Sequence, residues 1–146
     1  MPQQDAITLL DDDHNEVAAM FAQYKSAHTD NQKRMLAQQI CQELDVHMQV
    51  EEEIFYPAFR AASGNGEVVD EGKHEHDEAR ELMARIQEAP ADARLMLELE
   101  DAILHHVNDE REKMFPQARK TQGLDLMRLG DQLQARKSEL MAAQAG

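Results

Sequence analysis

The chain has 146 residues, of which 15 are basic and 29 acidic, so its formal net charge is −14. Such a charge repels phosphate backbones and anionic lipid, which argues against nucleic acid and membrane surfaces as partners. The single cysteine, Cys41, cannot form an internal disulfide, and no apolar N-terminal run has the pattern of a signal peptide or a membrane span. We therefore expect a cytoplasmic protein with one domain, in which Cys41 is a small, partly buried core residue.

Proline and glycine are sparse, and the stretches between them are rich in Ala, Leu, Met, Gln, Glu, Lys and Arg, which are good helix formers. The chain should therefore be all-α. Helical spacing and the positions of Pro and Gly predict four helices, at about residues 4–28, 30–61, 66–88 and 91–119. Short connections favour antiparallel neighbours, so these helices should form an up-down-up-down four-helix bundle.

A fifth helical stretch is expected at about residues 124–142, where leucines form a weak apolar edge. We expect residues 1–120 to form the bundle and residues 121–146 to be a helical extension of the same domain. This extension packs either on the end of the bundle, as a cap on the core, or on a partner subunit. A monomer and a homodimer are both compatible with the sequence.

Each of the four bundle helices carries an apolar stripe at helical spacing, with a histidine near its middle. These histidines are His14, His47, His76 and His106. The second stripe continues past its histidine through Glu51, Ile54 and Ala58. Pro57 and Pro116 lack an amide hydrogen and crowd the carbonyl four residues back, so each is expected to kink or end its helix.

The second and fourth helices share the string His-x3-Glu-x-Glu-x2-aromatic-Pro, which begins at His47 and again at His106. Residues four apart lie on one helical face, so each histidine and the glutamate after it (Glu51 or Glu110) direct an imidazole and a carboxylate toward the same point. The first and third helices repeat a shorter acidic-His-x-Glu string. The chain therefore has the pattern of a duplicated helical hairpin whose halves meet at one site.

Glu51 and Glu110 lie within apolar stripes, where an unpaired carboxylate is costly and takes up a proton. Imidazole and carboxylate donors suit iron, manganese or zinc. Four histidines and two glutamates are too many for one tetrahedral zinc but match two metal ions bridged by both carboxylates. The predicted ligands are His14 and His47 for one ion, His76 and His106 for the other, and Glu51 and Glu110 as bridges.

Other polar residues near the stripes are expected to face solvent. His74 and His105 lie on polar helical faces, although His105 and Asp109 form a competing His-x3-Asp pair. Tyr24 and Tyr56 are expected in the core or at its rim. The sequence leaves open whether His74, His105 or a tyrosine supplies an extra metal ligand. The remaining residues that we expect outside the ligand set are His28, Glu52, Glu53 and Glu112.

At these residues the sequence resembles the hemerythrin-like family, also called the HHE cation-binding domain. The resemblance spans about residues 5–120 and rests on the motifs Asp13-His14, His47-x3-Glu51 with Phe55 and Pro57, Glu75-His76, and His106-x3-Glu110 with Phe115-Pro116. It implies a four-helix bundle that holds two non-haem iron ions. It also implies carboxylate bridges and often an oxo or hydroxo group between the irons. Manganese or zinc are possible substitutes for iron.

The sequence departs from the oxygen-carrying hemerythrins. Those proteins have a fifth histidine one turn after the third-helix ligand, where this chain has Arg80, with Gly72 one turn before the ligand. They usually place Asp five residues after the last histidine, whereas Glu110 follows His106 by four. The pattern is more similar to the His-HxxxE-His-HxxxE branch, which includes iron-sensing domains and proteins implicated in nitric-oxide stress and repair of iron-sulfur centres. The cysteine-containing N-terminal region of the repair proteins does not occur in this sequence.

Three function classes follow. The favoured one is a di-iron protein that binds or reacts with O2, nitric oxide or peroxide at a coordination position left incomplete near the His76/His106 metal. The second is a di-iron oxidoreductase enzyme, although the sequence has no recognisable substrate pocket or cofactor motif. The third is an iron-sensing or iron-delivery protein whose folding depends on the metal.

Overall fold

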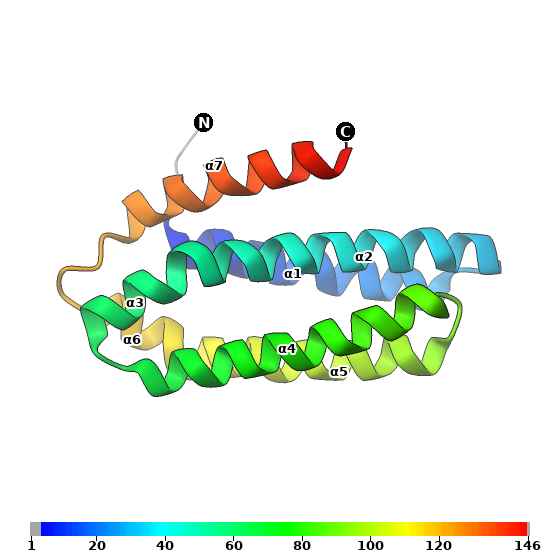
Figure 1. The fold of residues 1–146 in the computed structure, drawn as a ribbon, viewed down its shortest axis with the longest axis horizontal. Coiled ribbons are helices and arrows are strands. Elements are labelled where there is room, and N and C mark those ends of the chain that lie inside the picture. Colours follow the sequence, from blue (N-terminus) through cyan, green and yellow to red (C-terminus); the bar gives the residue numbers. More distant parts are fainter. Residues whose placement is uncertain (1–3, 146) are drawn as a thin grey trace.

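The computed structural model describes residues 4–145, and within them the chain is helical apart from short connections (Figure 1). Consecutive bundle helices run antiparallel, so the predicted all-α up-down-up-down bundle is confirmed. The two predicted parts of the chain were residues 1–120 and 121–146. Of these, residues 1–3 and 146 lie outside the described residues. Within residues 4–145, no helix combines the length and apolar character needed to cross a membrane. The bundle helices are α1 (Ala6–Ser26), α2 (Asp30–Val50), α4 (Gly66–Glu88) and α5 (Ala93–Asp109).

A side chain caps the start of each of the four bundle helices, and two of these caps show why the helices begin where they do. At the start of α2, the Thr29 side chain accepts a hydrogen bond from the Gln32 amide, and the Gln32 side chain accepts one from the Thr29 amide. At the start of α4, Asn65 accepts a hydrogen bond from the Val68 amide. It follows Gly64, whose φ of 73° lies in the left-handed region that glycine adopts without strain. The predicted starts of both helices, at residues 30 and 66, are therefore confirmed.

Each helix that carries the His-x3-Glu string contains a π-helical turn, which begins at the glutamate. The turns are η1 (Glu51–Phe55) and η2 (Glu110–Met114), and they lead into α3 (Tyr56–Ser63) and α6 (Phe115–Lys120). The prolines stand in the first turn of α3 and α6, where a missing amide hydrogen is tolerated. The helices therefore do not end at the prolines; they continue after the π turn, and α3 slopes away from the line of α2 (Figure 1).

The π turn also changes which residues face the core after Glu51. One extra residue in the turn rotates the following helix by about one position. Phe55 and Phe59 are therefore buried, while Ile54 and Ala58 are only partly buried. The prediction that Ile54 and Ala58 continue the inward stripe is wrong, because it assumed an uninterrupted α-helical period.

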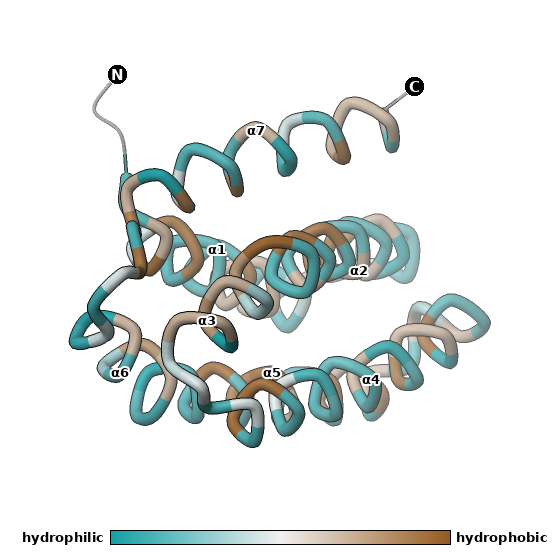
Figure 2. The backbone as a smooth tube through the Cα atoms, turned by 60° about the vertical axis from the view of Figure 1, so that its left-hand side comes forward, coloured by the Kyte–Doolittle hydropathy of each residue, from teal (hydrophilic) through white to brown (hydrophobic). Residues whose placement is uncertain are grey.

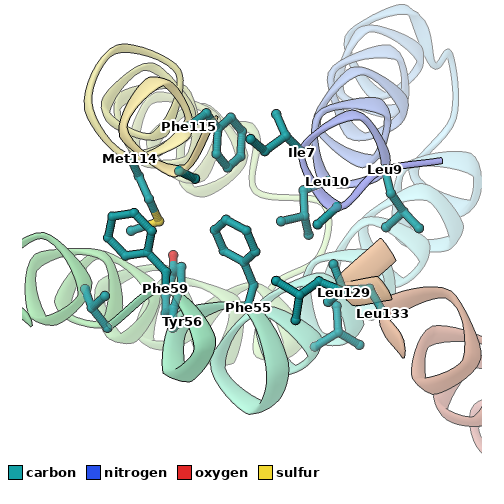
Figure 3. Packing of buried hydrophobic residues seen from close by; sticks show 14 of the residues in the cluster. Ile7, Leu9, Leu10, Phe55, Tyr56, Phe59, Met114, Phe115, Leu129 and Leu133 are labelled. Atoms are coloured by element: carbon teal, nitrogen blue, oxygen red, sulfur yellow. The ribbon is translucent and has the colours of Figure 1, made fainter. Parts of the chain in front are cut away.

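Two apolar clusters form the core, one toward each end of the bundle. The cluster that contains α3 and α6 is rich in aromatic residues, and Figure 3 shows Phe55 pointing inward between Leu10 and Phe115. The rings of Phe55 and Phe115 meet edge to face with centroids 6.1 Å apart. In all four bundle helices, the stripe histidine lies where the two clusters meet. The middle of the bundle is therefore polar, between two apolar ends.

The C-terminal helix α7 (Leu126–Ala145) packs along α1 and α2, so this pair lies between α7 and the α4/α5 pair (Figure 1). Its hydrophobic positions recur on the side that faces the bundle (Figure 2), and Leu129 and Leu133 are buried there. Gly130 permits the close approach, because a Cβ at this position would lie 2.1 Å from the Gln4 carbonyl oxygen. The helix thus covers the side of the bundle and not its end.

Candidate metal centre

The polar interior of the bundle consists of the predicted ligand residues. Among the described residues, the buried polar or charged side chains are His14, His47, His76, His106, Glu51, Glu110 and one more, Asp13. Glu51 is 0% exposed and Glu110 is 2% exposed. The structure therefore brings all six predicted ligand residues together from four helices, in the middle of the bundle.

The Nε2 atoms of the four histidines face the two glutamates. The distances are 3.1 Å from His14 Nε2 to Glu110 Oε1, 3.1 Å from His47 Nε2 to Glu51 Oε1, 3.2 Å from His76 Nε2 to Glu51 Oε1 and 3.4 Å from His106 Nε2 to Glu110 Oε1. Each glutamate therefore contacts one histidine from the first half of the chain and one from the second. This is the arrangement that two shared carboxylates between two ions require.

Two groups of donor atoms are close enough to hold a cation each. One group is His14, His47 and Glu110, and the other is Glu51, His76 and His106; within each group the donor atoms lie within 4.8 Å of one another. The histidines are paired as the sequence predicted.

Several donor atoms at the centre are buried without a hydrogen-bond partner. Among the described residues, these include Nε2 of His14 and His47, both carboxylate oxygens of Glu51 and Oε1 of Glu110. Buried polar atoms are almost always hydrogen-bonded, so converging lone pairs without partners are unusual. Nitrogen and oxygen donors left in this state fit metal cations, which would bind these lone pairs.

On the outer side of each imidazole, Nδ1 faces a carboxylate oxygen. The pairs are His14 with Asp11 at 3.1 Å, His47 with Asp13 at 3.1 Å, His76 with Glu52 at 2.6 Å and His106 with Glu75 at 2.8 Å. A carboxylate that accepts the Nδ1 proton holds the ring in the tautomer whose Nε2 lone pair points inward. All four histidines are thus oriented as metal ligands.

Sequence analysis missed these outer carboxylates. Asp13 and Glu75 were visible as the acidic residue before each first histidine, but each holds the histidine of the neighbouring helix, not its own neighbour in sequence. Glu52 was expected to be solvated, which is wrong. Its side chain is 25% exposed and accepts hydrogen bonds from His76 and Arg80. Arg80, at the position of the fifth histidine in oxygen carriers, therefore supports the site from outside.

A basic side chain backs each outer carboxylate. The contacts are Arg111 to Asp11 at 2.7 Å, Lys137 to Asp13 at 2.6 Å, Arg80 to Glu52 at 2.8 Å and His105 to Glu75 at 3.2 Å. Lys137 comes from α7, so the C-terminal helix takes part in holding a ligand histidine. Two of the four pairs, Asp13 with His47 and Glu75 with His106, occupy matching places in the two halves of the chain, whereas Asp11 and Glu52 do not.

Tyr56 also reaches the centre. Its hydroxyl lies 3.0 Å from Glu110 Oε2, 3.3 Å from His76 Nε2 and 3.5 Å from His106 Nε2. Its ring stacks on His76 with centroids 5.4 Å apart. Gly72 leaves the space for it, because a Cβ there would lie 2.9 Å from the tyrosine hydroxyl.

The repeat contained a signal for this role of Tyr56. Its two copies differ in the aromatic residue before proline, Tyr56 in one and Phe115 in the other. Phe115 stacks on His14 at 6.1 Å, in the equivalent position but without a hydroxyl. The other tyrosine, Tyr24, donates its hydroxyl to the Pro90 carbonyl oxygen over 3.0 Å and does not belong to the centre.

The buried charges shift several pKa values. Burial by itself would raise the pKa of Glu51, but the charge of the nearby His47 holds this pKa well below its usual range. Burial by itself would lower the pKa of His47, but Glu51 and Asp13 raise it to about 10. Burial and the charges of Glu110 and Glu51 raise the pKa of Tyr56 well above its usual range. A cation that binds beside His47 must therefore displace a proton from its imidazole.

The remaining predicted positions lie outside the centre. His74 is exposed and faces Glu78 at 2.8 Å, and His28, Glu53 and Glu112 are also exposed, as expected. Cys41 is buried, and burial together with the charge of Asp45 raises the pKa of its thiol to about 11. A thiol with this pKa is a poor nucleophile, so Cys41 is a core residue.

Two small surface clefts border the centre. The first, between α1 and α5, is lined mainly by apolar side chains and ends at His14; its lining includes Val17, Ala18, Phe21, Ile103, Leu104 and Val107. The second, between α4 and the α5/η2 helix, is lined by acidic side chains and by two predicted ligands; its lining includes Glu71, Glu75, Asp109, His106 and Glu110. The two clefts therefore differ in polarity.

Comparisons with known proteins agree with the site. A sequence model of the hemerythrin HHE cation-binding domain matches residues 5–118. The chain is also 28% identical, over 116 residues, to a protein from Nostoc sp. that is named DNA nickase. That match covers 77% of this chain and 32% of the relative, so the chain spans about a third of the relative's length. No solved structure matches the chain.

Proposed function

The chain belongs to the hemerythrin HHE cation-binding domain family, and we propose that its buried centre holds two iron ions. We further propose that the iron pair binds or reacts with O2, nitric oxide or peroxide. The ligand set is the one expected from the sequence: His14 and His47 for one ion, His76 and His106 for the other, and Glu51 and Glu110 shared between them.

The sharing of each glutamate between the two halves of the chain is the observation that carries this proposal. Glu51 lies 3.1 Å from His47 Nε2 and 3.2 Å from His76 Nε2, although it is fully buried. Two carboxylates in such positions offset part of the charge of two divalent ions and bind both of them. The same donors also suit manganese or zinc, so iron is the finer part of the proposal.

An iron pair supplies redox chemistry and coordination positions for a small ligand when it is bound. The surrounding residues prepare the site for it. The outer carboxylates hold the imidazoles in the tautomer that binds metal, and the two apolar clusters keep bulk water away. The Tyr56 hydroxyl lies 3.0–3.5 Å from three donor atoms, a spacing typical of atoms that share one ion. We therefore propose Tyr56 as an additional oxygen donor beside His76 and His106.

This position of Tyr56 changes where a small ligand would bind. The sequence pattern placed the incomplete coordination position beside His76 and His106, where the tyrosine hydroxyl now lies. On the other side, Phe115 occupies the equivalent place and offers no donor atom. The apolar cleft between α1 and α5 ends at His14. We propose that O2 or nitric oxide, which are small and weakly polar, enters along this cleft and binds on the His14 side.

Iron sensing is a second candidate, and one observation favours it. Lys137 of α7 donates to Asp13, which holds His47. Loss of the metal would free His47 and Asp13 to move, and the docking of α7 would weaken. The oxidoreductase alternative has no comparable observation to favour it.

For nucleic acid we propose no role. The name of the Nostoc relative refers to DNA, but this chain spans about a third of that protein and carries a net charge of −14. Such a charge opposes binding to a phosphate backbone.

Metal analysis of iron-loaded variants tests the proposal. The variants are Glu51→Gln and Glu110→Gln, and the matched controls are Glu53→Gln and Glu112→Gln, which change the exposed glutamate two positions later in each copy of the repeat. We expect wild-type protein and controls to retain about two irons per chain and to show the near-ultraviolet absorption of a bridged iron pair. The two ligand variants should lose at least one iron.

Added azide should shift the wild-type spectrum if a coordination position is open. Wild-type protein that retains no iron after aerobic loading, or ligand variants that retain as much iron as their controls, would overturn the proposed site.

A further inference from the structure

A second group of donor atoms lies at the surface, outside the buried centre. It consists of Glu75 on α4 with His105 and Asp109 on α5. The His105 Nε2 atom lies 3.2 Å from Glu75 Oε2 and 3.4 Å from Asp109 Oδ2. Donors bound to one transition-metal ion at about 2.1 Å are separated from one another by about 3.0–3.4 Å. The cluster thus has the dimensions of a metal site with one imidazole and two carboxylates.

Within the part of the chain that the structure describes, one oxygen of Asp109 is left without a hydrogen-bond partner, so it is free to bind a cation. Its Oδ2 atom is buried and has no hydrogen-bond partner among the described residues, although the side chain as a whole is 20% exposed. The nearest ammonium, Lys113 Nζ, lies 3.9 Å from the other oxygen, Oδ1, and its side chain is 53% exposed. An exposed pair at this distance contributes little. Oδ2 therefore faces His105 with a free lone pair.

The cluster stands at the acidic cleft that borders the centre. Glu75 and Asp109 line this cleft together with the ligand residues His106 and Glu110. Glu75 connects the two sites directly, because its Oε1 atom accepts from His106 Nδ1 over 2.8 Å while its Oε2 atom faces His105. A cation at the surface cluster would therefore be one carboxylate away from a ligand histidine.

We propose that Glu75, His105 and Asp109 bind a divalent transition-metal ion, and that this ion is the first station for iron on its way into the buried centre. Carboxylate and imidazole oxygen and nitrogen donors suit Fe²⁺, Mn²⁺ and Zn²⁺. Acidic side chains along the cleft attract the ion inward. The geometry of the three side chains supports the binding site independently of the buried centre, whereas the loading role rests on the proposed di-iron function.

Zinc titration of iron-loaded protein tests the binding site. Calorimetry should detect one further Zn²⁺ per chain, and His105→Ala or Asp109→Asn should weaken it by about 10-fold or more. His74→Ala is the matched control, because His74 is equally exposed and faces a single carboxylate, Glu78, one turn away. It should leave zinc affinity unchanged. Equal zinc binding by His105→Ala and His74→Ala would overturn the site.

Stopped-flow uptake of Fe²⁺ by metal-free protein tests the loading role. Asp109→Asn should load more slowly than wild type and His74→Ala but reach the same final iron content, because Asp109 lies outside the four His–carboxylate–base chains that orient the buried histidines. An unchanged uptake rate would overturn the loading role. The same zinc titration, repeated on metal-free protein, tests the surface site even if the di-iron proposal fails. Even if wild-type protein retains no iron, Asp109→Asn should bind one Zn²⁺ fewer than His74→Ala.

Discussion

Lys137 and Asp13, which are 124 positions apart, form a hydrogen-bonded ion pair with 2.6 Å between Nζ and Oδ1. The Lys137 side chain is 20% exposed and that of Asp13 is 7% exposed. The other oxygen of Asp13 lies 3.1 Å from Nδ1 of the ligand His47. One mostly buried carboxylate thus connects the C-terminal helix to the proposed metal centre.

We expect Lys137→Met to weaken both α7 docking and metal binding. Removal of the cation leaves Asp13 buried without its charged partner, which costs about 1–3 kcal/mol in the free energy of unfolding. Metal affinity should fall by about 10-fold or more, since Asp13 would hold His47 less firmly. Denaturant unfolding and competitive zinc titration measure the two effects. Arg136→Met is the control on the same helix, because Arg136 pairs with the exposed Glu53. Equal metal affinities of Lys137→Met and Arg136→Met would contradict this role of Lys137.

Tyr56→Phe tests the additional oxygen donor. A phenolate bound to iron(III) absorbs visible light, so we expect a visible band in wild-type protein that the variant lacks, while both retain about two irons per chain. Tyr24→Phe is the control, because the hydroxyl of Tyr24 bonds to the Pro90 carbonyl oxygen away from the centre. The assignment fails if the band persists in Tyr56→Phe or is absent from wild type.

Gly72→Ala should displace the Tyr56 ring. The added Cβ would lie 2.9 Å from the tyrosine hydroxyl and 3.2 Å from its ring carbon, and this buried ring has little room to move. We expect a loss of about 1–3 kcal/mol of stability, as for other overpacked cores, and a weaker visible band. Gly66→Ala is the control on the same helix, because its Cβ would meet only the movable end of the exposed Arg60 side chain. A Gly72→Ala protein as stable as Gly66→Ala would show that the space is not needed.

Metal binding should release protons and strengthen as pH rises. His47 has a pKa of about 10 in the folded protein without metal, against about 6.5 in an unfolded chain. Its contribution to the stability of metal-free protein is therefore fully present below about pH 6.5 and is lost as pH rises through about 10. Thermal melts of metal-free protein at pH 6 and pH 9 test the predicted loss of stability. The pH change on zinc addition in weak buffer tests the predicted release of protons. A melting temperature of metal-free protein that rises from pH 6 to pH 9 would contradict the predicted contribution of His47 to stability.

Removal of metal should lower the melting temperature at neutral pH. At a free metal concentration 100 times the dissociation constant, binding adds about 2.7 kcal/mol to the stability of the folded state. For a chain of this size, that corresponds to about 5–10 °C in melting temperature. Calorimetric scans of loaded and chelated protein measure the difference. If the protein senses iron, removal of the metal should increase hydrogen exchange more in α7 than in α5. Equal melting temperatures of loaded and chelated protein would count against iron sensing.

The all-α bundle and the residues that gather at its buried centre could be predicted because their signals are local and repeated. Helix formers, caps such as Thr29 and Asn65, and the apolar stripes depend on residues at most a few turns apart. The His-x3-Glu spacing places His47 with Glu51, and His106 with Glu110, on one face of a helix whatever the rest of the chain does.

Only the tertiary structure decided the support around these ligands. The His-x3-Glu string does not reveal the π turn after Glu51, which rotates Phe55 inward and brings Tyr56 to His76. No local pattern pairs Asp13 with His47 and Lys137, because these residues meet only when α7 packs on α1 and α2. The sequence by itself thus determined which side chains lie at the centre, while packing between distant helices decided which groups orient them and which hydroxyl joins them. The physical reason is that helical periodicity acts within one element, whereas a hydrogen bond between elements depends on how their faces meet.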